Sequence, residues 1–319
     1  MLVGLSENLL LVDLDNPTNY NVGMISGTDL AYAAGYIDGD GCFSINRIKG
    51  AERVRDTCSV IINSTELENL EWFQSKFSGN IYPQKEIDPT HKPLYRYELK
   101  GDNLDWLLDI ARFLIEKREE CLLFAEFFRS KSRIDREIYL IRMKELKESY
   151  LIPVSIKEPL EKLRNTISPS NYDFAYLAGF IDAECCLGIQ KNPPANGSNP
   201  TYKIQLQCNN SKSPCFKWLV ERFGGQLHFI NRSKYLNNRN QMTWRLSSAA
   251  LYPILKMIRP FLIHKQPVCD ELIKLHETKV PLKGCISRNS PNFSEFYQPI
   301  LNEREHIFLK VKQLNKKGI

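Results

Sequence analysis

The sequence lacks the features of a membrane, secreted or zinc-finger protein. Its longest apolar run near the start, Leu9 to Val12, is far too short to cross a bilayer. No basic segment precedes an apolar run, so no secretory signal and no membrane partner are expected. The nine cysteines are odd in number and contain no C-x-x-C pair, which argues against a zinc site or a disulfide framework. We expect reduced thiols in an intracellular or organellar compartment.

The composition is that of a globular protein with a small basic excess. Of the 319 residues, 43% are hydrophobic and 25% are charged, which excludes general disorder. The formal net charge of +6 is compatible with a nucleic-acid partner but does not by itself establish one.

The chain contains two copies of one unit. LAYAAGYIDGDGCFSI at 30–45 matches FAYLAGFIDAECCLGI at 174–189, at an offset of 144 residues. Two further matches follow in the same order: WFQSKFSG of the first copy matches WLVERFGG of the second, and FLIEK matches FLIHK. We predict an N-terminal arm at 1–27, a first repeat at 28–135, a linker at 136–172 and a second repeat with a basic tail at 173–319.

Hydrophobic periodicity changes in the same order within both copies. The first copy predicts a helix at 30–37, strands at 43–46 and 55–63, a helix at 66–77, strands at 80–86 and 95–100, and a helix at 102–115. The second copy predicts the same order, with closing helices at 249–261 and 268–277. The fold class is therefore α+β, with αββαββα repeats and antiparallel sheets.

Small residues recur at every fourth position of the first helix in each copy: Ala31, Gly35 and Gly39, and Ala175, Gly179 and Ala183. This spacing places them on one helix face. Glycine within a helix costs about 1 kcal/mol relative to alanine, so the helix must need close contact there. We predict that the two helices pack against each other.

Each of these helices ends in an acid, Asp40 or Glu184. Carboxylates are unfavourable at a helix C-terminus, and pairing of the helices would bring the two acids together. A positive group should therefore lie there. With the carbonyl oxygens of Gly39 and Ala183, the acids form an all-oxygen donor set that suits Mg²⁺.

Asp38 and Asp182 lie two residues before these acids and point away from the shared helix face. We interpret both as structural residues that bond backbone amides. The alternative for Asp40 and Glu184 is that both are surface acids in turns. Their matched positions in the two copies favour a common site.

The nine residues Ala33–Gly41 and the nine residues Leu177–Cys185 resemble the motif of the LAGLIDADG homing endonucleases. The resemblance covers about residues 28–130 and 173–280. It implies the two-motif monomeric form, whose halves pack through their first helices and whose sheets form a saddle over DNA. The sequence departs from the motif at Ala33, which replaces a leucine, and at Cys185, which replaces a glycine. Glycine suits a left-handed turn after a helix, so we expect strain at Cys185.

The resemblance implies hydrolysis of two phosphodiester bonds, one per strand, with Mg²⁺ as cofactor and short 3′ overhangs as product. Metal ligation is assigned to Asp40 and Glu184. Lys117 and Lys265 would stabilise developing charge or orient solvent, and Asn63 and Asn210 would hold a water network. The complete catalytic set is Asp40, Glu184, Lys117, Lys265, Asn63 and Asn210.

The solvent-exposed faces of the strands are expected to contact base edges in the major groove of DNA. A strand of about eight residues spans about eight base pairs, so two halves predict a target of about 16–20 base pairs. The candidate DNA-binding residues are Ser44, Asn46, Arg55, Thr57, Ser59, Gln84, Arg96, Gln190, Lys203, Gln205, Gln207, Asn231, Thr243 and Arg245.

Three other functions stay open at this point: an intron-encoded RNA maturase of the same fold, a noncatalytic DNA-binding relative, and a structural two-domain protein. The resemblance implies double-stranded DNA as partner, with intron RNA as the partner of a maturase. It also implies a monomer without an obligate protein partner, encoded in a mitochondrion or chloroplast.

Overall fold

The computed structural model describes residues 25–49, 54–85, 92–100, 106–149, 166–194, 199–210, 214–230, 241–278 and 293–316. The first repeat contains α1 (Gly27–Asp40), β1 (Gly41–Lys49), β2 (Val54–Ser64), α2 (Leu67–Phe77), β3 (Asn80–Pro83), β4 (Tyr95–Lys100), α3 (Trp106–Ala111), α4 (Arg118–Arg129) and α5 (Arg133–Ser149). The second repeat contains α6 (Asn171–Glu184), β5 (Cys185–Asn192), β6 (Thr201–Asn210), α7 (Pro214–Phe223), β7 (Gln226–Ile230), β8 (Gln241–Leu246), α8 (Ser248–Ile258), α9 (Gln266–Glu277) and α10 (Phe293–Leu314). Residues 1–24 of the predicted arm lie outside the described residues.

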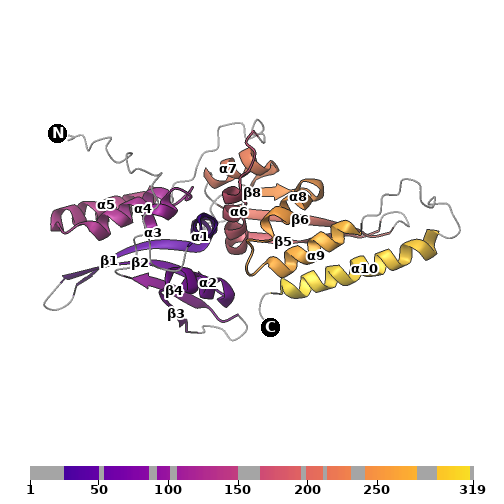
Figure 1. The fold of residues 1–319 in the computed structure, drawn as a ribbon, viewed down its shortest axis with the longest axis horizontal. Helices are drawn as coiled ribbons and strands as arrows, with labels where there is room; N and C mark the ends of the chain where they lie inside the picture. The colour runs from indigo at the N-terminus through magenta and orange to yellow at the C-terminus, as the bar shows by residue number, and fades with distance from the viewer. Residues whose placement is uncertain are drawn as a thin grey trace.

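Each repeat builds one four-stranded antiparallel sheet. The strand order is β1-β2-β4-β3 in the first repeat and β5-β6-β8-β7 in the second. Helices α1 and α6 lie side by side at the centre, with one sheet on either side of the pair (Figure 1). Alternate strand residues, such as Phe43, Val60 and Ile62, are buried against the helices, which leaves the opposite sheet face polar. The predicted α+β repeat architecture is confirmed.

The two central helices begin in the same way. The hydroxyl of Ser26 accepts a hydrogen bond from the backbone N–H of Asp29, whose carboxylate accepts one from the backbone N–H of Ser26. Ser170 and Asp173 form the same reciprocal arrangement at the start of α6. Such a capping box satisfies backbone donors that the first helical turn cannot pair.

The later helices differ from the predicted pattern. The helix predicted at 102–115 is replaced by the short α3 and by a turn that leads into α4. Helix α5 extends into the predicted linker, packs against α4 and contacts β1 through the side chains of Lys147 and Glu137. Helix α10 packs against α9 and β5. Both helices therefore belong to the repeats that precede them. No helix in the described ranges is long and apolar enough to span a bilayer.

Two predictions about Cys185 are wrong. Its backbone is extended, with φ −97° and ψ 146°, so no left-handed conformation strains it; Gly41 at the end of α1 is extended as well. Its sulfur is bonded to that of Cys208, the residue directly opposite on β6, at a Cα–Cα distance of 4.3 Å. Pairing across neighbouring strands depends on their register, which cysteine spacing alone does not reveal.

Candidate active site

The close contact of α1 and α6 creates the centre of the site. A Cβ atom on Gly35 would lie 2.9 Å from the carbonyl carbon of Tyr176, and one on Gly179 would lie 2.9 Å from that of Tyr32. These contacts are reciprocal, as a pseudo-twofold axis between the helices requires. The predicted packing of the two small-residue faces is confirmed.

Asp40 and Glu184, the last residues of the two helices, meet beside this axis. A Cβ atom on the neighbouring Gly39 would lie only 2.9 Å from Cγ of Glu184. Both acids remain open to solvent although protein atoms surround much of each side chain. Desolvation, together with the nearby Glu184 carboxylate, raises the pKa of Asp40 to about 7. Desolvation also raises the pKa of Glu184. The pair therefore favours a bound proton or cation.

A lysine ammonium lies against the C-terminal carbonyl groups of each helix. Nζ of Lys117 donates to four carbonyl oxygens within residues 37–41, at 2.7–3.3 Å. Nζ of Lys265 donates to the carbonyl oxygens of Ile181 and Asp182. The positive charge expected beside the two acids is thus supplied in part by the chain itself. Both ammonium groups lower the pKa values of the two acids, which opposes the effect of desolvation.

Asp38 and Asp182 hold the loops that carry these lysines. The Asp38 carboxylate accepts hydrogen bonds from three backbone N–H groups in residues 115–117, at 2.7–3.2 Å. The Asp182 carboxylate accepts from the N–H groups of residues 263 and 265, at 2.8 and 2.9 Å. The interpretation of both acids as structural is confirmed. The amides that they bond are remote in sequence, because the turn before α4 or α9 folds back onto the end of the motif helix.

Two tyrosines that sequence analysis missed link the repeats. The Tyr176 hydroxyl donates to Oδ2 of Asp38 at 2.7 Å, and the Tyr32 hydroxyl donates to Oδ2 of Asp182 at 2.9 Å. Burial, with the aspartate charge second, raises the pKa of both phenols well above 10, so both stay protonated. The signal was present in the sequence, because the two tyrosines occupy equivalent positions 144 residues apart.

Replacing Tyr176 by phenylalanine is expected to lower the free energy of unfolding by about 2 kcal/mol, because a buried carboxylate loses a hydrogen bond while the ring packing remains. Urea unfolding followed by circular dichroism measures the change. Tyr97→Phe is the matched control, since the buried Tyr97 hydroxyl has no hydrogen-bond partner within the described ranges. Equal effects of the two substitutions would contradict the role of the link.

The two predicted asparagines do not occupy equivalent positions of the two repeats. Asn63 lies on the exposed face near the end of β2, opposite Arg96 of β4. The strand registers make Asn209 its equivalent in the second repeat, opposite Thr243. Asn210 is one residue further along β6, opposite Met242. Asn209 is oriented by hydrogen bonds from Thr243 at 2.6 Å and Gln207 at 3.2 Å.

Most predicted DNA-binding residues share the polar sheet faces. Ser59 and Thr243 lie on these faces but are buried, and Arg96 is paired with Glu98 at 3.2 Å. Arg55 lies in β2, Gln84 directly follows β3, and Asn231 is outside the described residues. The strand registers place the others on the same faces: Ser44, Asn46, Thr57, Gln190, Lys203, Gln205, Gln207 and Arg245.

The donor chemistry of the site fits a hard divalent cation only in part. Asp40 and Glu184 supply carboxylate oxygens, which Mg²⁺ prefers. The carbonyl of Gly39 is already in contact with the Lys117 ammonium at 3.3 Å. No group of three or more His, Cys, Asp or Glu side chains able to hold a metal occurs in the described chain. A cation there would need further oxygens from water or from a substrate.

Solved structures share this fold. The LAGLIDADG homing endonuclease I-SmaMI bound to cleaved DNA matches with a TM-score of 0.63 and 15% identity, over 92% of this chain and 99% of that chain. The LAGLIDADG meganuclease I-AabMI bound to uncleaved DNA matches with a TM-score of 0.54 and 18% identity, over 89% of this chain and 97% of that chain. This chain has the LAGLIDADG homing endonuclease fold.

I-SmaMI bound to an uncleaved DNA target in the presence of calcium ions has the same LAGLIDADG fold. It matches with a TM-score of 0.58 and 14% identity, over 89% of this chain and 98% of that chain. No protein-family model matches the chain, and no curated protein matches it in sequence. At these identities the likeness establishes the LAGLIDADG fold.

Proposed function

We propose that the chain is a site-specific DNA endonuclease that makes a double-strand cut with short 3′ overhangs by hydrolysis dependent on a divalent cation. The observation that carries this proposal is the meeting of Asp40 and Glu184 at adjoining helix ends, each backed by a lysine. The structures of I-SmaMI and I-AabMI with bound DNA support the same partner.

Asp40 and Glu184 are the proposed ligands of Mg²⁺, and oxygens of water or of the DNA phosphates would complete the donor set. A bound divalent cation would supply Lewis-acid stabilisation of phosphate charge and activation of water. With a pKa of about 7, the Asp40 carboxyl is partly protonated near neutral pH. Cation binding is therefore accompanied by release of a proton from this carboxyl.

The lysines have different roles in this proposal. An ammonium group has three N–H donors, and those of Lys117 are engaged by four carbonyl oxygens. Lys117 is therefore a positioning residue that holds the helix end, and its charge lowers the pKa values of the two acids against the effect of desolvation. Lys265 donates to two carbonyl oxygens of the described chain, so one N–H remains for solvent or a phosphate.

The sheets support the proposed target length. β2 has 11 residues and β6 has 10. At about 3.3 Å per residue, each strand spans about ten base pairs, so two halves reach up to about 20 base pairs. The proposed site of about 16–20 base pairs fits this length. We further propose a monomer that carries both active-site acids on one chain and is encoded in an organellar intron.

The test uses purified protein and a duplex that joins the two sequences flanking the insertion site of its reading frame. We expect a double-strand cut at one position with Mg²⁺, no cut with EDTA, and full recovery when Mg²⁺ is added back. Sequencing of the ends gives the overhang. Specific gel shifts without cleavage would instead indicate a DNA-binding relative, and stimulation of intron splicing without cleavage would indicate a maturase.

A further inference from the structure

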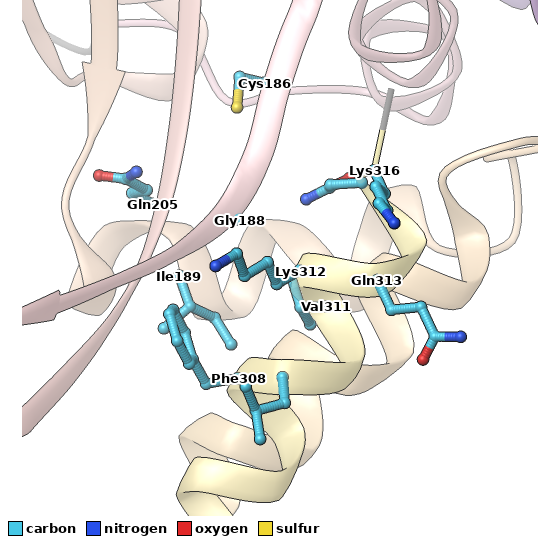
Figure 2. A pocket seen from close by; sticks show the side chains of 11 residues that line it. Cys186, Gly188, Ile189, Gln205, Phe308, Val311, Lys312, Gln313 and Lys316 are labelled. Carbon is cyan, nitrogen blue, oxygen red and sulfur yellow. The ribbon is translucent and has the colours of Figure 1, made fainter. Parts of the chain in front are cut away.

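A hollow of about 690 Å³ lies between the polar face of β5 and β6 and the C-terminal turns of α10. The sheet contributes Cys186, Gly188 and Gln205, and α10 and the residues after it contribute Lys312, Gln313 and Lys316 (Figure 2). Gln205 is one of the predicted DNA-binding residues. The hollow therefore adjoins the surface proposed to read bases, but its basic groups come from a helix outside the sheet.

The lysines and the arginine of α10 and of the residues just after it fall into two groups. Lys310 is paired with Glu271 at 2.8 Å, and Arg304 donates to the carbonyl oxygen of Thr278 at 2.8 Å. Lys312 and Lys316, which line the hollow, form no ion pair with any residue that the structure describes. The lining of the hollow contains no acidic side chain. Two uncompensated positive charges and several amide groups thus share one concave surface.

The first repeat provides an internal comparison, because α5 and α10 occupy equivalent places. Nζ of Lys147 on α5 donates to the carbonyl oxygen of Phe43 in the edge strand β1, at 2.7 Å. Nδ2 of Asn315, just after α10, donates to the carbonyl oxygen of Leu187 in the edge strand β5, at 2.8 Å. Phe43 and Leu187 are equivalent residues of the two repeats, 144 positions apart.

The hollow beside α5 has a different charge pattern. Its basic residues Arg47, Lys144 and Lys147 are interleaved with Glu137 and Glu148. Arg47 is paired with Glu137, and Lys144 lies 3.8 Å from Glu148. The same structural place therefore has two acidic side chains beside its three basic ones in the first repeat, and basic side chains without acidic ones in the second. Helices α5 and α10 each cover an edge strand, and this role explains why both are present. It does not explain why the lysines of the second repeat have no acidic partner among the described residues.

We propose that this hollow binds a backbone phosphate of double-stranded DNA. Lys312 and Lys316 supply the charge, and Gln205 and Gln313 supply amide donors. This inference rests on the proposed function and extends it, because α10 adds a sequence-independent contact beside one half of the target. Contacts of this kind set the register of a protein on a duplex without reading its bases. Only the second repeat would then have this additional phosphate contact beside α10, so the two halves of the protein would bind DNA through different numbers of contacts.

The test measures binding to a duplex of about 30 base pairs without a target sequence, in EDTA, over a range of salt concentrations. Each phosphate contact contributes about 0.9 to the slope of log K against log salt. We expect the double variant Lys312→Gln/Lys316→Gln, which loses this one phosphate contact, to have a slope shallower by about 0.9. Lys312→Arg/Lys316→Arg should bind like the wild type, because it retains both charges. Lys131→Gln/Lys217→Gln is the matched control, since both lysines are exposed and lie outside the polar sheet faces.

The outcomes separate the two proposals. Absence of salt-dependent binding by the wild-type protein would overturn the proposed function itself. Wild-type binding with equal slopes for the Lys312/Lys316 and Lys131/Lys217 glutamine variants would overturn only the phosphate contact. Loss of binding in the arginine variant would also overturn it, since the charge would then not be what matters. Circular dichroism of each variant confirms that the proteins compared are folded.

Discussion

Replacing Asp40 by asparagine is expected to slow double-strand cleavage by at least about 10³-fold. The substitution removes one of the two carboxylates proposed to hold the cation, which stabilises the transition state by several kcal/mol, and each 1.36 kcal/mol corresponds to a tenfold change in rate. Glu184→Gln should have a similar effect, because the two acids occupy equivalent helix ends. Single-turnover cleavage in Mg²⁺ measures both rates. Wild-type cleavage by either variant would remove that acid from the proposed site.

Asp40→Asn is also expected to stabilise the fold in the absence of divalent cations. The pKa of Asp40 is raised from 3.8 to about 7 in the folded protein, so ionisation opposes folding as the pH rises between these values. The variant removes this penalty, and at pH 8 it should gain about 1 kcal/mol once solvent screening of the open carboxylate is included. Urea unfolding at pH 8 in EDTA measures the gain.

Asp38→Asn is the matched control for this effect, and it should act in the opposite direction. Its carboxylate accepts hydrogen bonds from three backbone N–H groups and from Tyr176, so the amide would destabilise the protein. A gain in stability for both variants would show that loss of negative charge alone explains the result. A gain in stability for Asp40→Asn together with a loss of stability for Asp38→Asn supports different roles for these two acids, which lie two residues apart.

Replacing Gly35 by alanine is expected to lower the free energy of unfolding by at least about 3 kcal/mol. The added Cβ would lie 2.9 Å from both the backbone N of Phe180 and the carbonyl carbon of Tyr176 on the other helix. Backbone cannot move aside as a flexible side chain can, so the change exceeds ordinary overpacking of about 1–3 kcal/mol. Chemical unfolding measures the effect. Since a domain is stable by only about 5–15 kcal/mol, the double variant Gly35→Ala/Gly179→Ala is not expected to fold.

Gly188→Ala is the matched control for the glycine variant. The closest atom to a Cβ at Gly188 is Nδ2 of Asn315, at an ordinary contact distance of 3.6 Å. This substitution should leave stability almost unchanged, although alanine generally restricts the unfolded chain more than glycine does. If Gly35→Ala were as stable as Gly188→Ala, the two motif helices could not be in backbone contact.

Much of the fold was predictable because its signals are local and repeated. The alternating strands and the small-residue faces of α1 and α6 each depend on residues only a few positions apart. Repetition then indicated that the two helices pair, and pairing placed Asp40 beside Glu184. The later helices were less predictable. The turn between α3 and α4 is held by Asp38, which is remote in sequence, so no local pattern marks it.

The sequence by itself determined that one unit occurs twice, that small residues line one face of each motif helix, and that an acid ends each of these helices. Tertiary structure alone decided that Lys117 binds helix carbonyl groups, that Tyr32 and Tyr176 cross between the repeats, and that Asn209 rather than Asn210 matches Asn63. It also decided that Lys312 and Lys316 have no acidic partner among the residues that the structure describes. Helical and strand periods are properties of neighbouring residues, whereas hydrogen bonds, registers and ion pairs depend on which distant segments the packed core brings together.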